Sequence, residues 1–421
     1  MDMRIAVIGG GVAGCSCAWR LARSPHVASV TLFEMGRKAG GRAGTRQTRQ
    51  IPGLMVNHGA PLFHFSQPSS EVASLLTLLQ TSGHLVPWEG TFGMYDVQAM
   101  RTMEGWASEG AEPGPKSEVS HFQGAPGMSS MCHGILQCAA SKVETRYGIK
   151  VSSMMRAGDS QGEPWEVYDQ EGNSLGQFDW VVVTSASLGH EYNGKRLFGD
   201  APLLHAAAQS TVFSELHDAV RHITGTYSAS PRHVAMMAWP TSQEVVETLR
   251  QLPYDVTVIE ESDVLSRVVR QSLDEPYLVV VVHSTEEFSM VNWGTIGSAG
   301  MASSMRLEGS LGTLTGEQAV LDEMVNAFQV MVSQIAGRPL PKPEWGPCLH
   351  RWGAAFPNAT YGLDKCDEQQ SLLFPRARVA VAGDFLSQPR GTIEGAMQSG
   401  LEAASGVLRA LVVTPGPVGA Y

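Results

Sequence analysis

Short apolar runs alternate with stretches of helical spacing from the start of the chain. Residues 4–8 and 30–33 form two such runs, and the small and apolar residues between them recur at helical spacing. A short continuous apolar run is typical of a strand covered on both faces of a parallel sheet. The N-terminal segment therefore predicts strand, helix and strand, in that order.

The same patterns predict further elements of an α/β protein. They are a helix at 70–83, a helix from residue 127 through 147, a strand around Val151, a hairpin that starts at 165–168, a buried strand at 180–184, a strand at 378–382 and a helix at 391–411. Ligands of open α/β sheets bind at the carboxyl ends of such strands.

The region from residue 191 to 344 mixes strands and helices without a repeating order. The elements expected in it are strands at 233–239, 256–260 and 277–282 and a helix at 316–337. This mixed order fits an inserted α+β unit with an antiparallel sheet better than repeated βαβ units. Residues 104–117 and 294–315 are rich in turn-forming residues, so we expect loops there.

Three glycines, Gly9, Gly11 and Gly14, separate the first predicted strand from its helix in the pattern Gly-x-Gly-x-x-Gly. In this pattern the glycines permit a tight turn, the approach of a pyrophosphate and close helix packing, respectively. Glu34 ends the second strand 20 residues after Gly14, where a carboxylate accepts hydrogen bonds from a ribose 2′-OH. A dinucleotide site at the helix N-terminus is favoured over a Gly-rich turn beside an exposed glutamate.

A glycine pair and an arginine follow shortly after Glu34 and Met35, at Gly40, Gly41 and Arg42. Backbone amides and a guanidinium at this position can bind the same pyrophosphate. The alternative is a solvated basic loop. Because the pair comes directly after Glu34, we favour phosphate binding.

The composition limits the classes of partner. The chain has 421 residues, 43% of them hydrophobic, which is enough for two or three cores, and its formal net charge is −11. An acidic chain argues against a nucleic acid or an anionic membrane as partner. The apolar runs are far shorter than the roughly 20 residues that a membrane helix needs, and no secretory signal is visible. We therefore expect a soluble, cytoplasmic protein.

The six cysteines show no Cys-x-x-Cys pair with a histidine partner. Buried free thiols are therefore expected, and no metal site.

Motifs along nearly the whole chain resemble those of the flavin-containing amine oxidase superfamily, in particular its renalase-like branch. The matching segments are the glycine motif, Glu34, Gly40-Gly41-Arg42, the Asn-His-Gly-Ala of 57–60, the His-Arg-Trp of 350–352, Gly383-Asp384, and the Gly-Thr-Ile-Glu-Gly-Ala of 391–396. The sequence departs from the branch at Asn57, where renalase-like sequences usually carry Asp.

The resemblance implies FAD rather than NAD as the cofactor. FAD is expected to be noncovalent, because no Cys or His stands in a recognisable attachment motif. The implied fold is a Rossmann-type FAD-binding domain, similar to glutathione reductase, with an inserted α+β substrate domain that contains an antiparallel sheet. The expected FAD-binding domain comprises 1–66, 127–190 and 345–421, and the substrate domain comprises 67–126 and 191–344.

The resemblance also assigns cofactor-binding residues. In relatives the aspartate of Gly-Asp binds the ribityl chain, and the next helix directs its N-terminal N–H groups at the pyrimidine end of the flavin, where they can stabilise negative charge. The residues implied are Gly9, Gly11, Val12, Ala13, Gly14, Glu34, Met35, Gly40, Gly41, Arg42, His58, Gly59, Ala60, Val151, Thr184, Gly383, Asp384, Thr392, Ile393 and Ala396.

Substrate-facing residues carry over from segments that approach the flavin in relatives. These are His58, Arg351 and Trp352, together with His283, whose segment leads into a helix of the substrate domain. For each of them a packing role is the alternative. We expect His58 and Trp352 to lie near the flavin rather than to transfer protons, because the redox step belongs to the cofactor.

The expected reaction is removal of a hydride from a small donor, with O2 as acceptor and hydrogen peroxide as product. Similarity to renalases implies a dihydropyridine isomer of a nicotinamide nucleotide as donor. A small amine is the alternative; relatives that oxidise amines use an aromatic cage and a lysine near the flavin, and Lys365 is the nearest candidate here. An alternative of another class is a flavin-binding interaction protein with dispensable catalysis.

Overall fold

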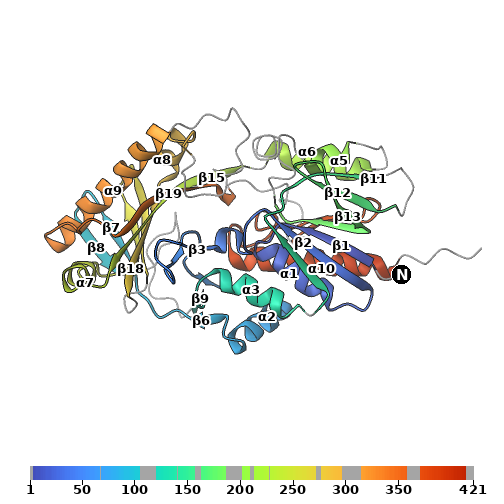
Figure 1. Ribbon diagram of the computed structural model, residues 1–421, viewed down its shortest axis with the longest axis horizontal. Helices are drawn as coiled ribbons and strands as arrows, with labels where there is room; N and C mark the ends of the chain where they lie inside the picture. Colours follow the sequence, from blue (N-terminus) through green and yellow to red (C-terminus); the bar gives the residue numbers. More distant parts are fainter. Residues whose placement is uncertain are drawn as a thin grey trace, which may run out of the picture.

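Two large sheets and their covering helices make up the chain in this computed structural model (Figure 1). The structure describes residues 3–66, 68–104, 120–139, 141–156, 163–185, 202–208, 213–226, 228–271, 276–295, 314–357 and 370–413. The expected loops at 104–117 and 294–315 lie almost entirely outside the described residues.

The first sheet has six strands in the order β10-β2-β1-β14-β21-β20. They are β1 (Met3–Ile8), β2 (Val27–Glu34), β10 (Val143–Tyr147), β14 (Trp180–Val183), β20 (Leu372–Phe374) and β21 (Val379–Val381). All neighbours pair in parallel except β20 with β21. The predicted strands near residues 4–8, 30–33, 180–184 and 378–382 are confirmed.

Side chains of β1 alternate between two cores, as a strand covered on both faces requires. Ile5 and Val7 enter a core with the helices α1 (Val12–Ala22), α2 (Ser70–Thr81), α3 (Ser129–Gln137) and α10 (Ile393–Val413). Ala6 and Ile8 enter a second core on the other face. That core contains the small sheet of β11 (Val151–Arg156), β12 (Trp165–Asp169) and β13 (Ser174–Phe178), and the helices α5 (Pro202–Ala207) and α6 (Ser214–Thr226).

The predicted helix from residue 127 through 147 is wrong in its second half. Helix α3 ends at Gln137, and Val143–Tyr147 is β10, which pairs in parallel with β2 at the sheet edge. The residues of β10 include β-branched and aromatic side chains that favour strands. This strand propensity and the pairing with β2 together determine the structure here. The pairing is a long-range contact that the local sequence pattern does not contain.

The second sheet has seven strands in the order β19-β15-β18-β17-β16-β7-β8. They are β7 (Phe92–Asp96), β8 (Arg101–Glu104), β15 (Ala229–Pro240), β16 (Val256–Glu260), β17 (Leu265–Gln271), β18 (Tyr277–Ser284) and β19 (Trp345–Pro357). Neighbours pair antiparallel except β7 with β16.

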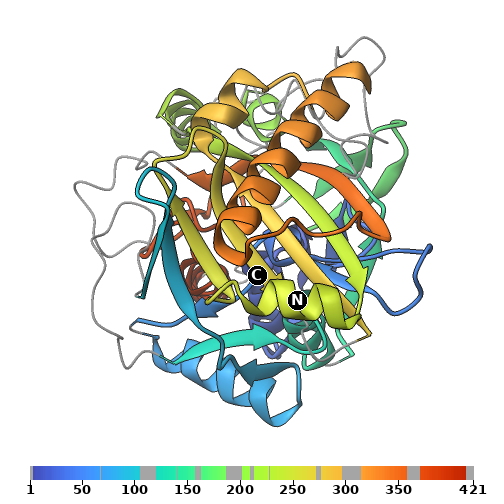
Figure 2. The same cartoon turned by 90° about the vertical axis from the view of Figure 1, so that its left-hand side faces the viewer.

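Each face of the second sheet has a different partner. Val280 and Val282 lie on the outer face, whose core includes Met324 and Phe328 of α9 (Leu314–Ala336) and residues of α7 (Gln243–Arg250). Figure 2 shows α9 lying across this face. The inner face packs instead against residues 51–62, which include β4 (Met55–Asn57). In Figure 1, β3 (Thr45–Gln47), the partner of β4, lies between the two large sheets.

Three segments pack with a different core from the one expected of their domain. Strand β19 belongs to the second sheet, whereas α2 and the helices α5 and α6 pack on the first. A small sheet of β5 (Phe63–His64), β9 (His121–Gly124) and β6 (Leu85–Pro87) also contributes side chains to the core that contains α1 and α2. The chain therefore crosses between the two large sheets more often than the sequence predicted.

Helix α10 crosses α1 at a contact that only glycine permits. A Cβ atom on Gly400 would lie 2.1 Å from the carbonyl oxygen of Ala13, whereas one on Gly406 would meet only the Leu373 side chain, at 3.3 Å. We predict that Gly400→Ala lowers the free energy of unfolding by about 1–3 kcal/mol through overpacking. Gly406→Ala is the control on the same helix and should be neutral or stabilising, since alanine favours helices. Denaturant unfolding of both variants tests this; equal effects would contradict it.

Candidate functional site

The turn between β1 and α1 is held by contacts that exclude side chains. Gly9 has a φ of +113°, and a Cβ on Gly14 would lie 1.9 Å from the carbonyl oxygen of Gly9. The hydroxyl of Thr184 lies 3.0 Å from the carbonyl oxygen of Ile8 and 3.1 Å from that of Gly9. Gly9 and Gly14 are therefore required by the fold itself, and Thr184 supports the turn.

Gly11 differs from the other two glycines. It is the N-cap of α1 with an ordinary φ of −76°, and a Cβ built on it meets nothing within 4 Å. Neither the backbone nor the packing of the described residues therefore requires a glycine there. The open space lies against the first N–H groups of α1, where an anion is stabilised by the helix dipole. A dinucleotide pyrophosphate fits this position.

The carboxylate of Glu34 is fixed by two backbone amides. Its oxygens accept hydrogen bonds from Gly10 N at 2.7 Å and Gly36 N at 2.6 Å. Burial raises the pKa of Glu34, and the two hydrogen bonds act in the opposite direction. The remaining lone pairs of a carboxylate can accept from ribose hydroxyls, so the predicted role is compatible with this geometry.

The second glycine loop lies directly against the first. Gly40 N donates to the carbonyl oxygen of Gly10 at 2.8 Å, and a Cβ on Gly41 would lie 3.2 Å from Cα of Gly11. Arg42 follows in a short 3-10 helix (Gly41–Ala43) and pairs with Asp384 at 2.5 Å. The structure thus brings together residues that are more than 340 positions apart in the sequence.

The N-terminus of α10 completes this side of the site. Gly383 has a φ of +151° and Asp384 is 5% exposed. The Thr392 hydroxyl caps α10 by accepting from Gly395 N at 3.0 Å, and Ala396 N donates to the carbonyl oxygen of Thr392. These residues lie where the resemblance expects the flavin, and their assignment as ligands stays a prediction.

The remaining predicted cofactor residues occupy several environments. Val12 and Ala13 form the buried first turn of α1, and Met35 is 38% exposed. Ala60 N donates to the carbonyl oxygen of Arg42, and a Cβ on Gly59 would lie 1.9 Å from the same oxygen. The side chains of Val151 and Ile393 pack in the cores on opposite faces of the first sheet, so only their backbone groups could face a ligand.

His58 joins the loops of the first sheet to the inner face of the second. Its ring stacks on Trp352 with centroids 5.1 Å apart and meets His350 edge-to-face at 4.8 Å. Trp352 Nε1 donates to the carbonyl oxygen of His58 at 3.0 Å. Two of the predicted substrate-facing residues, His58 and Trp352, are therefore in contact.

The histidines of this cluster are held neutral. Burial lowers the pKa of His58 to about 4 and that of His283 to about 3, and Arg46 and Arg267, respectively, add to the two shifts. Burial also lowers the pKa of His350, with a contribution from His58. Among the described residues, His58 Nδ1, His283 Nε2 and both ring nitrogens of His350 have no hydrogen-bond partner. Neutral imidazoles can donate or accept, but they do not act as cations here.

The Asn57 side chain anchors the segment that carries His58. Its Oδ1 accepts from the Thr45 hydroxyl at 2.8 Å and from Met128 N at 3.0 Å. Its backbone N–H and carbonyl pair with the side-chain amide of Gln271 on β17, at 3.1 and 2.7 Å. The departure from the renalase-like pattern therefore falls on a residue that bonds to both large parts of the fold.

Arg351 does not join this cluster. Its Nη1 donates to the carbonyl oxygen of Trp293, and its guanidinium lies 4.5 Å from the Trp293 ring. Since neighbouring residues of a strand project to opposite faces, Arg351 is on the other face from His350 and Trp352. Its approach to the flavin stays a prediction, and on this face Arg351 is separated from the ring contact of His58 and Trp352.

Sequence reasoning named His350 only within the matching His-Arg-Trp segment, not as a site residue, and did not name Gln271 or Arg267. His350 precedes the predicted Arg351 and Trp352, and the alternation along β19 would have placed it on the same face as Trp352. On β17, Arg267, Val269 and Gln271 stand at alternate positions and therefore share one face, but the strand as a whole shows no regular polar and apolar alternation.

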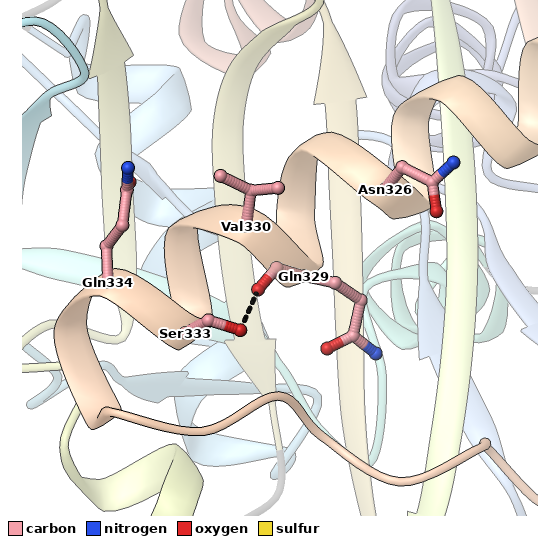
Figure 3. Close-up of a pocket in the computed structure, with 5 residues that line it drawn as sticks. All are labelled: Asn326, Gln329, Val330, Ser333 and Gln334. Carbon is pink, nitrogen blue, oxygen red and sulfur yellow. Dashed lines mark hydrogen bonds between the residues drawn. The ribbon is translucent and has the colours of Figure 1, made fainter.

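A shallow depression of about 440 Å³ lies elsewhere, along α9. Figure 3 shows its lining residues Asn326, Gln329, Val330, Ser333 and Gln334, with the Ser333 hydroxyl bonded to the Gln329 carbonyl. These amide, hydroxyl and aliphatic groups offer no ionisable group or strong nucleophile, so we do not place the functional site there.

The described residues contain no cluster of His, Cys, Asp and Glu able to hold a metal ion. Within the same part of the chain, no helix combines the length and the apolar character that crossing a membrane demands.

Comparisons with known proteins support the nucleotide-binding fold. The family profile of the NAD(P)-binding Rossmann-like domain matches residues 7–79. A sequence search of curated proteins gives no significant match.

Solved structures of similar fold cover nearly the whole chain. Cyclohexylamine oxidase from Brevibacterium oxydans IH-35A is 14% identical, with a TM-score of 0.61 over 98% of this chain and 100% of its own. A protein of Exiguobacterium sp. 255-15 described as a proposed protoporphyrinogen oxidase is 11% identical, with a TM-score of 0.58 over 98% and 100%. A putrescine oxidase redesigned in its cofactor binding is 11% identical, with a TM-score of 0.55 over 97% and 99%. This chain therefore shares the α/β fold of these oxidases.

The buried neutral histidines predict acid sensitivity. His283 is 8% exposed and its pKa falls from the ordinary 6.5 to about 3, so the unfolded chain takes up its proton first as the pH drops. Above pH 6.5 the neutral His283 does not lower the free energy of unfolding. As the pH falls from 6.5 toward 3 it lowers that free energy progressively, by about 2 kcal/mol at pH 5. Unfolding at pH 7.5 and pH 5 should therefore show a smaller loss for His283→Asn than for the wild type. His26→Asn, at an exposed site, is the control and should lose as much stability between the two pH values as the wild type. A loss in His283→Asn equal to that of the wild type would refute the assignment of the acid sensitivity to His283.

Proposed function

We propose that the protein is an FAD-dependent oxidoreductase that holds its flavin noncovalently and removes a hydride from a small donor, with O2 as acceptor and hydrogen peroxide as product. The observation that carries the proposal is the open space at Gly11, bordered by the N-terminus of α1 and by Gly41. A pyrophosphate needs open space beside the backbone, and such space is expected where neither packing nor backbone conformation explains a glycine.

The sequence resemblance favours a flavin over NAD, and the neighbouring structures fit an oxidase. The names of two of them, cyclohexylamine oxidase and putrescine oxidase, describe oxidases of amines, and their fold extends over both large sheets of this chain. A dinucleotide that begins at Gly11 and continues past Arg42 and Asp384 would reach the start of α10 and then the cluster of His58 and Trp352. This path joins the residues that the resemblance assigned.

Each part of the site has a distinct task in this proposal. The flavin supplies the hydride acceptor. Gly11 and the first amides of α1 bind the pyrophosphate, and Glu34 binds the adenosine ribose. The N-terminal amides of α10 stabilise negative charge at the pyrimidine end. His58 and Trp352 exclude water and form one wall of the donor site.

The donor we favour is a dihydropyridine isomer of a nicotinamide nucleotide. Loss of hydride from it restores an aromatic ring and leaves no proton for a base to remove. The neutral histidines of the site suit such a reaction because no catalytic base is needed. An amine is the second candidate, favoured by the names of the neighbours; it must be neutral before it loses hydride. Lys365, the candidate lysine for that chemistry, lies outside the described residues.

Gly11→Val tests the cofactor site. We predict that the variant folds with wild-type secondary structure but retains less than about a tenth of the flavin, since the isopropyl group enters the pyrophosphate space. The measurement is the flavin-to-protein ratio in the supernatant after acid precipitation, with Gly11→Ala as the graded control. Wild-type flavin content in the valine variant, or colour that stays in the acid pellet of the wild type, would contradict the proposal.

The donor prediction is tested by anaerobic stopped-flow reduction of the bound flavin. We expect the 2- and 6-dihydro isomers of NAD and NADP to bleach it at least about tenfold faster than ordinary NADH or a panel of mono- and polyamines. The physical reason is that the isomers release hydride without a base. Fast bleaching by an amine, with the nucleotide isomers inert, would establish the second candidate instead.

A further inference from the structure

A row of four paired residues, three of them polar, crosses the inner face of the second sheet. Directly paired residues of neighbouring strands project to the same face, and His350, Val234, His283 and Arg267 are paired in this way across β19, β15, β18 and β17. Val234 belongs to the inner-face core, so the whole row faces the loops of the first sheet. At about 4.8 Å per strand spacing, the row is about 14 Å long.

Basic residues surround the histidines of this row. Arg232, next to Val234 along the face and paired with Trp352 on β19, is 7% exposed. Arg267 and Arg232 both lower the pKa of His283, and Arg46 on β3 lowers that of His58, which places these guanidinium groups close to the ring cluster. Glu286 is one acidic group beside them, with its carboxylate 3.7 Å from Arg232.

This basic character is unusual for the chain. The protein carries 41 acidic and 30 basic residues, yet arginines border this row on three strands. A charge that approaches a buried guanidinium in a low-dielectric site interacts more strongly than it would in water. An aminium ion would therefore be repelled here, whereas an anionic group would be stabilised by charge-assisted hydrogen bonds.

We infer that Arg232 and Arg267 form an anion subsite in the donor pocket, which selects a planar donor that carries a carboxylate or a phosphate. The unpartnered nitrogens of His283 and His350 lie in the same row and can hydrogen-bond the polar edge of the ring. This inference rests on the proposed function for the identity of the site as the donor pocket. It adds to that function the negative charge of the substrate and two residues that determine specificity, Arg232 and Arg267.

Matched pyridine compounds test the subsite without turnover. Nicotinate and nicotinamide differ by a carboxylate, and nicotinamide mononucleotide and nicotinamide riboside differ by a phosphate. Each is titrated into the flavin-loaded protein and followed by the change in flavin absorbance and by calorimetry. We expect at least one anionic member to bind about tenfold or more tightly than its partner; which pair shows the difference identifies the carboxylate or the phosphate as the ligand group.

Variants assign the effect to the arginines. Arg267→Gln and Arg232→Gln should abolish the preference within that pair, and Arg267→Lys should retain part of it because the charge remains. Arg250→Gln, at an exposed position on α7, is the control and should behave as the wild type. Thermal unfolding confirms that each variant is folded. Equal binding within both pairs by the wild type, or an unchanged preference in both glutamine variants, would overturn the inference.

The test separates the subsite from the donor reaction. Anion preference together with failure of every dihydropyridine to reduce the flavin would retain the subsite and reject the proposed donor. Rapid reduction by a dihydropyridine without any anion preference would retain the donor and reject the subsite.

Discussion

Pairing between the Gln271 side-chain amide and the backbone of Asn57 fixes the relation of the two large sheets at the site. The amide provides both a donor and an acceptor, as a neighbouring strand would, and so extends the second sheet to the segment that carries His58. On its other side, Asn57 is bonded to Thr45 and Met128, which belong to the loops around the first sheet. Both amides are half-buried, and an arrangement that broke these hydrogen bonds would leave polar groups unpaired, which favours the one observed.

The glycines around the nucleotide loop show how a fold and a ligand impose different requirements on one motif. Gly9 and Gly14 are set by the backbone and by contacts below 2.6 Å from a hypothetical Cβ, so they would be needed without any ligand. Gly11 has neither constraint. The same motif therefore contains two glycines that the fold requires and one, Gly11, that it does not, which is where the proposed ligand would bind.

Local sequence predicted the parts of the fold that depend on local chemistry. The strand, glycine turn and helix at the start of the chain carry their signals within a few residues of one another. The hairpin of β12 and β13 likewise depends on the turn between its strands, where Gly172 has a φ of +80°. Strand β10 was missed because its partner β2 lies more than 100 residues earlier. The row that contains His350 and Arg267 was missed for the same reason: register between strands is a long-range property that no single segment records.

The electrostatics of the proposed donor site follow from this register. Placing three histidines against one another and beside arginines makes the protonation of any one of them unfavourable, because burial and like charge act in the same direction. A site of this kind has fixed positive charge on its arginines and neutral rings between them. It is suited to hold and orient a planar anion and poorly suited to accept a proton near neutral pH. The proposed removal of a hydride without a catalytic base agrees with this arrangement of charge.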